Sequence, residues 1–80
     1  MVSIRIRAED RLQFDASYIA WIREKYGSPT YQMPIVGAPH TVIDETGTSN
    51  VLLGIHQVPE QFLDFYRARG FWFENWERAK

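Results

Sequence analysis

The segment that most constrains the fold is residues 57–76, QVPEQFLDFYRARGFWFENW, where a helix pattern leads into a dense aromatic run. Pro59 suits the first helical position because it has no N–H and a fixed φ. That start places Val58 at the N-cap, where it offers no side-chain acceptor. Gly70 supplies the left-handed conformation with which helices commonly end. Between them, residues at spacings of three and four line one side: Phe62, Leu63, Phe65, Tyr66 and Arg69. We therefore predict an amphipathic helix here.

The aromatic run that follows the glycine has two alternative interpretations. As a strand, it places Phe71 and Phe73 on one face and Trp72, Glu74 and Trp76 on the other. If the phenylalanines face the core, the two tryptophans lie at the surface, and tryptophan is enriched in binding hot spots. As a helix, the run would stack the tryptophans one turn apart. The aromatic composition favours the strand.

The composition indicates one domain, residues 1–80, with a core rich in large side chains. A chain this short buries a modest fraction of its surface, and 45% of its residues are hydrophobic and 15% aromatic. There is no cysteine, and hence neither a disulfide framework nor a thiolate metal site. Val2–Arg7 is too short and too basic for a signal peptide, and no apolar run approaches membrane-spanning length. We expect a soluble, cytoplasmic protein without membrane contact.

Charge is distributed unevenly along the chain. The net charge of −1 argues against a protein that mainly contacts phosphates, since such proteins usually carry a basic excess. Residues 26–58 contain only two charged side chains, Asp44 and Glu45. This middle segment is therefore either buried or presents a neutral, partly apolar surface.

The first seven residues show the alternation of a strand with one buried face: Val2, Ile4 and Ile6 alternate with Ser3, Arg5 and Arg7. Both arginines then point outward together. The ordinary interpretation is a charged solvent face that prevents unwanted strand pairing. The alternative is a patch for nucleic acid or an acidic partner.

A second helix is predicted after a polar connection at Ala8–Gln13. Asp15 is expected as its N-cap, with Phe14 packing on Ile19 as a hydrophobic staple. The sequence Gly27-Ser28-Pro29 is expected to end it. The predicted buried stripe, with Trp21 at its flank, consists of Tyr18, Ile19, Ile22 and Tyr26.

The middle of the chain predicts extended structure and a hairpin. Tyr31–Val36 contains Pro34, which cannot donate to a ladder, so we expect an edge strand or an extended loop. A turn at Gly37-Ala38-Pro39 would follow. Gly54 indicates a bulge or a close approach of another group to the backbone. The hairpin is expected from two strands and a loop: His40–Asp44, Val51–His56 and Glu45–Asn50.

This order of elements predicts an α+β fold, β-α-β-β-(β)-α-β, where the strand in parentheses is optional. Two helices would cover one face of a small, mainly antiparallel sheet, in an order similar to a split β-α-β arrangement.

Chemical motifs are sparse. His40 and His56 flank the hairpin and could lie nearly opposite one another, but two ligands fall short of the three or four that zinc sites use. Serines and threonines occur without the spacing of a nucleophile and its base. We therefore expect no catalytic residues, no metal, no cofactor and no enzymatic activity.

Association with another protein, or with a second copy of the chain as a homo-oligomer, is the function that the sequence favours. The expected contact residues are Trp72, Glu74 and Trp76, with Arg5 and Arg7 as a secondary patch. An adaptor, an assembly subunit and a virus-encoded inhibitor of a host protein all fit this pattern. The alternative is a single-stranded nucleic-acid-binding module that uses arginines and aromatics on one sheet face.

Overall fold

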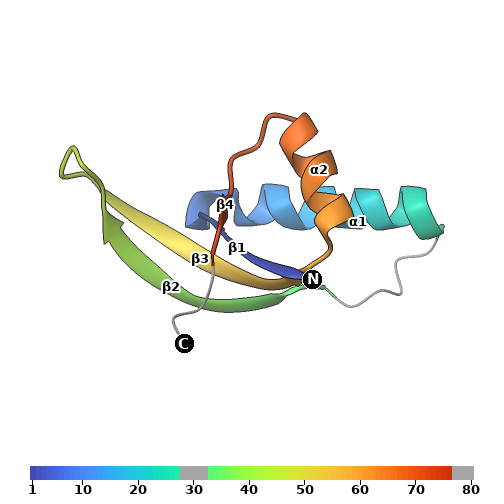
Figure 1. Ribbon diagram of the computed structural model, residues 1–80, viewed down its shortest axis with the longest axis horizontal. Coiled ribbons are helices and arrows are strands. Elements are labelled where there is room, and N and C mark those ends of the chain that lie inside the picture. Colours follow the sequence, from blue (N-terminus) through green and yellow to red (C-terminus); the bar gives the residue numbers. More distant parts are fainter. Residues whose placement is uncertain (28–32, 77–80) are drawn as a thin grey trace.

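The computed structural model describes residues 1–27 and 33–76. Figure 1 shows two helices on one side of a curved sheet, so the predicted α+β architecture is confirmed. A 3-10 turn at Ala8–Asp10 precedes the first helix. Helices and strands follow in the order β1 (Val2–Arg7), α1 (Arg11–Tyr26), β2 (Ile35–Ile43), β3 (Ser49–Val58), α2 (Glu60–Ala68) and β4 (Glu74–Asn75). Among the described residues, no helix is long and apolar enough to cross a membrane.

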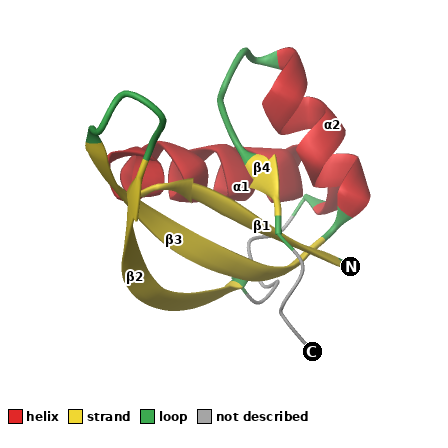
Figure 2. Cartoon of the chain, turned by 60° about the vertical axis from the view of Figure 1, so that its left-hand side comes forward, coloured by secondary structure: helices red, strands yellow, loops and turns green. Residues whose placement is uncertain are grey.

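The sheet has the strand order β2-β3-β1-β4, and all neighbouring strands are antiparallel. Strand β3 lies between β1 and β2, the two strands that α1 connects, which makes β1-α1-β2 a split β-α-β unit. The two edges differ, because β2 is nine residues long and β4 only two. Figure 2 shows the sheet beneath the helices.

The core lies between the helices and the face of the sheet that they cover. Alternation on the two central strands directs Ile4, Ile6, Leu53 and Ile55 toward the helices, and all four are buried. Phe62 lies at the centre of an aromatic cluster. Its ring centroid is 4.9–5.6 Å from those of four buried rings: Phe14, Tyr18, Trp21 and Tyr66. Such pairs add about 0.5–1.5 kcal/mol each beyond the area that they bury.

Helix α1 begins one turn earlier than the sequence predicted. Its first residue is Arg11, so the predicted polar connection at Ala8–Gln13 was too long: only Ala8–Asp10 precede the helix, and residues 11–13 belong to it. Asp15 lies inside the helix, where it pairs with Arg11 at 3.3 Å, and is not the N-cap. Phe14 is fully buried in the core and does not act as a staple. The extra turn places Phe14 on the buried side of the helix, and the burial of so large a side chain favours this start.

The buried stripe of α1 is correspondingly rotated. Tyr18 and Ile22 are buried as predicted, and Trp21 belongs to the stripe as well. Ile19 and Tyr26 were wrongly assigned to it, since they are 37% and 49% exposed. The helix ends at Gly27, whose φ of 71° gives the expected left-handed stop; residues 28 and 29 of the predicted stop lie outside the described residues.

Helix α2 is confirmed, with a start shifted by one residue. Pro59 is the N-cap, and Val58 is the last, fully buried residue of β3. The shift follows from this burial, which holds Val58 in the strand. The helix ends before Gly70, which has the predicted positive φ of 82°. Phe62, Leu63 and Tyr66 are buried, Phe65 is half-buried and Arg69 is exposed.

Strand β2 differs from the prediction because it continues through residues 37–39, where a turn was expected. A break in register between Val36 and Pro39 accommodates these residues within the strand. Of the candidate Tyr31–Val36, residues 31 and 32 lie outside the described residues, and Ile35 and Val36 begin β2. The hairpin itself is confirmed, with its loop at residues 44–48.

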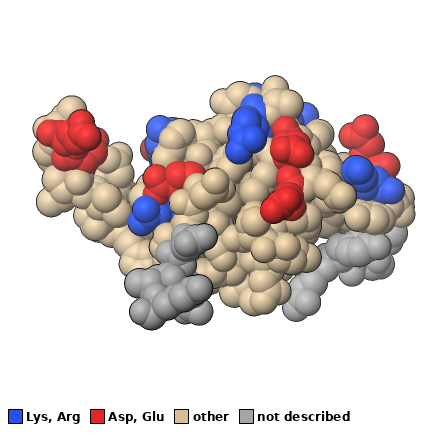
Figure 3. Space-filling view, viewed as in Figure 1, with Lys and Arg blue, Asp and Glu red and all other residues tan. Residues whose placement is uncertain are grey.

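The charge-poor middle of the chain has two environments. Strand β3 is largely buried, whereas most of β2 is exposed and forms a neutral edge. Asp44 and Glu45 are both exposed in the loop between them, and Figure 3 shows acidic groups gathered at the tip of this hairpin.

Candidate functional site

The face of the sheet away from the helices carries all the contact residues predicted from the sequence. On β1, alternation directs Arg5 and Arg7 to this face, because Ile4 and Ile6 enter the core. In β4, Glu74 lies opposite Arg5. We call this side the open face and define it by the strand residues directed to it together with the two tryptophans whose rings contact its arginines: Ser3, Arg5, Arg7, His40, Leu52, Gly54, His56, Trp72, Glu74 and Trp76.

The aromatic run after α2 divides between the two sides of the sheet as its alternation predicted. Phe71 and Phe73 pack against Tyr66, with ring centroids 5.1 and 6.1 Å away. Trp72 and Trp76 lie over arginines of the open face. Only residues 74 and 75 form a strand, and the helical alternative for this run was wrong. The core contacts of the phenylalanines therefore determine where the tryptophans lie.

The six-membered ring of Trp76 packs directly against Gly54, which is possible because Gly54 has no side chain. A Cβ atom added to Gly54 would overlap the indole ring. The backbone N–H of Trp76 donates to the carbonyl of Ser3 at 2.9 Å. The rings of His56 and His40 also contact the indole, with centroids 5.0 and 6.2 Å from it. The close approach that an isolated strand glycine indicates is therefore made by a tryptophan.

The arginines of the open face are engaged within the chain. Arg5 forms an ion pair of 2.5 Å with Glu74, and its guanidinium carbon lies 5.9 Å from the centre of the Trp76 ring. The guanidinium of Arg7 lies 4.7 Å from the centre of the Trp72 ring and 4.0 Å from Asp10. Cation–π contacts and nearby carboxylates both stabilise the arginine charge. As a result, the face is more aromatic than basic in character.

The sequence predicted these five residues as contact residues, but it placed arginines and aromatics on one sheet face only in the nucleic-acid alternative. For protein association Arg5 and Arg7 were a secondary patch, because the pairing of β1 with β4 joins residues about seventy positions apart, a separation that no local pattern reports. The structure brings the two groups together on one face.

The two histidines were missed as members of this face. They were expected nearly opposite one another, but His40 pairs with Leu52, and His56 pairs with Ile35. The expectation failed because β3 is longer than predicted and β2 contains a bulge. Gly54, beside which both rings meet the indole, was the signal that could have indicated the contact.

Side chains hold the histidine nearest to Trp76 in place. The Oγ atom of Ser3 lies 3.2 Å from Nδ1 of His56, within hydrogen-bond distance. Among the described residues, no group of three or more histidine, cysteine, aspartate or glutamate side chains is placed to hold a metal ion. The chemistry of the face is therefore that of aromatic, hydrogen-bonding and ion-pairing contacts.

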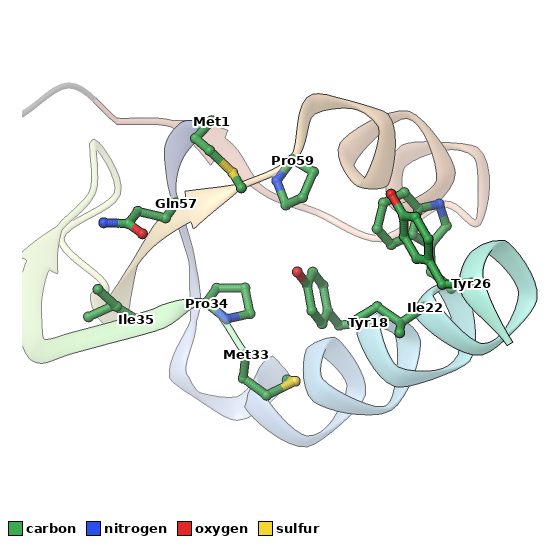
Figure 4. A pocket seen from close by; sticks show the side chains of 10 residues that line it. Met1, Tyr18, Ile22, Tyr26, Met33, Pro34, Ile35, Gln57 and Pro59 are labelled. Carbon is green, nitrogen blue, oxygen red and sulfur yellow. The ribbon is translucent and has the colours of Figure 1, made fainter. Parts of the chain in front are cut away.

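A mainly apolar hollow of about 280 Å³ lies elsewhere, between α1, the start of β2 and the junction of β3 with α2. Figure 4 shows the Tyr18 hydroxyl directed between Pro34 and Pro59. Burial, and secondarily Tyr26, raises the pKa of Tyr18, so this hydroxyl stays protonated at neutral pH. Gln57, which also lines the hollow, has a left-handed backbone with φ 61°. None of the predicted contact residues lies here.

Comparisons with known proteins give no match: no protein-family model matches the chain, and neither does a curated protein or a solved structure.

Proposed function

We propose that this chain is a small, non-catalytic binding protein that contacts another protein through the open face of its sheet. The observation that carries this proposal is the combination of two half-buried tryptophans with arginines that already have partners in the same chain. A surface of this kind can bury a large apolar area on binding. The desolvation penalty is small because its charged groups already have partners. Aromatic enrichment with few free charges is the pattern of the central part of protein interfaces.

The two tryptophans have different parts in this proposal. Trp76 fills the space above Gly54 and contacts two histidines, so it supports the shape of the face. Trp72 contacts the guanidinium of Arg7 and is half-buried. Replacing Trp72 therefore removes contact area from the face with less damage to the fold, which makes it the better probe of binding.

We expect Trp72→Ala to abolish or strongly weaken partner binding, by about 2 kcal/mol or more if Trp72 is an anchor. The measurement is affinity capture from a lysate of the source organism, with each captured protein then titrated against purified wild-type and variant chains. Leu12→Ala is the matched control, because Leu12 is 82% exposed on α1, away from the open face.

Two outcomes would contradict this prediction. A partner that binds Trp72→Ala as tightly as wild type, while both variants unfold at the wild-type urea concentration, would remove the open face from the proposal. Equal loss in Leu12→Ala would indicate non-specific apolar capture.

Single-stranded nucleic acid is the second candidate ligand, favoured by the presence of arginine and tryptophan side chains together on the face of the sheet away from the helices. Against it, Arg5 has a carboxylate partner in Glu74, and the chain has a net charge of −1. Titration with a single-stranded oligonucleotide at low salt separates the two ligands, because phosphate contacts are strongest there. Absence of binding under that condition eliminates nucleic acid.

The proposed role is that of an adaptor, an assembly subunit or a virus-encoded inhibitor of a host protein, acting in the cytoplasm. Each of these needs a stable surface and no reaction centre. Identification of the captured partner decides among them.

A further inference from the structure

The outer edge of β2 lacks the charged side chains that usually protect an edge strand. Ile35–Ile43 contains no aspartate, glutamate, lysine or arginine. Exposed edges of this length are commonly blocked by charges, prolines or bulges. Here a bulge and Pro39 interrupt the first half of the strand. The second half, Thr41–Ile43, lies in the part of the hairpin that extends beyond the helices (Figure 1).

The hydrogen-bonding direction of each β2 residue follows from the hairpin loop. The N–H of Asp44 donates to the carbonyl of Thr48 at 3.0 Å. Residue pairs in an antiparallel ladder alternate between bonded and non-bonded. Counting back from Asp44 along the register shows that the backbone N–H and carbonyl groups of Ile43 and Thr41, and the carbonyl of Pro39, point away from β3. Pro39 has no N–H to present, so the available pairing groups are concentrated at Thr41 and Ile43.

We propose that two copies of this chain pair through these edges, antiparallel, around a two-fold axis at Thr41. The N–H and carbonyl of Thr41 would bond to those of Thr41 in the second copy. The N–H of Ile43 would bond to the carbonyl of Pro39 in the second copy. The missing N–H of proline ends the pairing on both sides, so the site is self-complementary and limited in length.

The side chains of this arrangement are compatible with a second copy. His40 lies opposite Val42 and Asp44 opposite Ala38, so no two like charges meet. Ile43, which is 68% exposed on the helix side of the hairpin, lies opposite Pro39 of the second copy and gains cover from it. The net charge of −1 gives little repulsion between copies. Pairing in the plane of the sheet also leaves both open faces on the same side.

The dimer is independent of the proposed function, because it uses the edge of β2 and leaves Trp72 free. We would measure the subunit state of wild type by sedimentation velocity over a range of concentrations from about 1 μM to about 500 μM. The expected result is a concentration-dependent monomer–dimer equilibrium. Persistence of the monomer at the highest concentration would overturn the proposal. The edge of β2 would then be available for pairing with a strand from another protein.

Substitutions at the axis test the register. Thr41 is exposed, so Thr41→Lys leaves the monomer fold intact and places two lysines directly opposite in the dimer. We expect the dissociation constant to rise at least about tenfold. Thr41→Glu should have the same effect. An equimolar mixture of the two variants should restore the dimer, since lysine then faces glutamate.

Ala20→Lys, at an exposed position on α1, is the charge-matched control and should dimerise as wild type does. Loss of the dimer in this control, an unchanged dimer in Thr41→Lys, or a mixture that stays monomeric would each overturn the pairing proposed at Thr41. The Trp72→Ala variant should dimerise normally, so failure of the dimer and failure of partner binding are separate outcomes.

Discussion

Gly54 shows how a single residue shapes the candidate binding face. It occupies the centre of the sheet on a strand whose other positions favour branched and large side chains, and glycine there weakens a strand by itself. Its compensation is the Trp76 indole, which lies in the space that a Cβ atom would occupy. The stability that Gly54 contributes therefore comes from the packing of Trp76, twenty-two positions away. This packing is possible only because glycine has no side chain.

We predict that Gly54→Ala displaces Trp76 and destabilises the protein by about 1–3 kcal/mol, the usual cost of an added group in a packed site. The measurement is urea unfolding together with the indole N–H signals in a ¹⁵N–¹H NMR spectrum, where the Trp76 signal should shift most. Gly37→Ala is the control, because a Cβ there would lie 3.5 Å from Nε2 of His56, an ordinary contact. An unchanged Trp76 signal in Gly54→Ala would refute the close packing.

At the scale of the element, the hairpin loop at residues 44–48 contains a polar network centred on one carboxylate. The Oδ1 atom of Asp44 accepts the N–H and hydroxyl of Thr46 at 2.9 and 2.6 Å and the N–H of Thr48 at 2.9 Å. Its Oδ2 atom accepts the side-chain amide of Asn50 at 3.1 Å. Gly47 has the positive φ, 81°, that the turn needs. One carboxylate thus satisfies donors that the open hairpin end would otherwise expose to water.

These bonds lower the pKa of the Asp44 carboxyl, the Thr46 hydroxyl being the largest cause. A folded-state pKa below the unfolded one stabilises the fold above the unfolded pKa, and this stability is lost as the pH falls through the folded pKa. We therefore predict that Asp44→Ala lowers the urea midpoint at pH 7, and that the difference from wild type shrinks below about pH 4.

Urea unfolding at several pH values, with Glu45→Ala as the control for the neighbouring exposed carboxylate, makes this measurement. A difference between wild type and Asp44→Ala that stays constant from neutral to strongly acidic pH would contradict an effect of the ionised carboxylate.

The same elements show which features the sequence could predict. The alternation of Val2–Arg7 and the spacing of Phe62, Leu63 and Tyr66 are local, strong patterns, and both elements formed as predicted. The start of α1 was missed because Asp10, the true N-cap, makes no side-chain capping bond, whereas Asp15 is an acid that commonly caps helices. The four-residue spacing from Phe14 to Tyr18 indicated the correct start, because burying these two side chains stabilises the helix more than an N-cap at Asp15 would.

The candidate site could be predicted only in part, since its tryptophans, its arginines and Glu74 were expected and its two histidines were missed. Alternation in the aromatic run was enough to place Trp72 and Trp76 on one side. Their contacts with Arg7 and Arg5 depend on β1–β4 pairing, and that pairing follows from the packing of Phe71 and Phe73 on Tyr66. Long-range pairing of this kind is decided by tertiary packing and leaves no local sequence pattern.

On the scale of the whole molecule, buried packing is concentrated at the central strands of the sheet, and the end of the β2–β3 hairpin lies outside it. The helices cover the central part of β1 and β3, where Ile4, Ile6 and Ile55 are fully buried. The far half of the β2–β3 hairpin extends beyond them, and Ile43 and Val51 are exposed. Local stability follows the density of buried contacts, so the two halves of the sheet should open at different free energies.

We predict that hydrogen exchange reports this gradient in solutions too dilute for the proposed dimer to form. Amides of Ile4, Ile6 and Leu53, at the centre of the sheet, should exchange only through global unfolding, which for a domain of this size costs about 5–10 kcal/mol. Amides of Val42 and Asn50, paired in the extending hairpin, should exchange through local opening at a clearly lower free energy. Equal protection at both sites would show that the hairpin unfolds only with the core. In that case the edge of β2 would be held as rigidly as the centre of the sheet, and the entropy lost when two copies pair would be smaller.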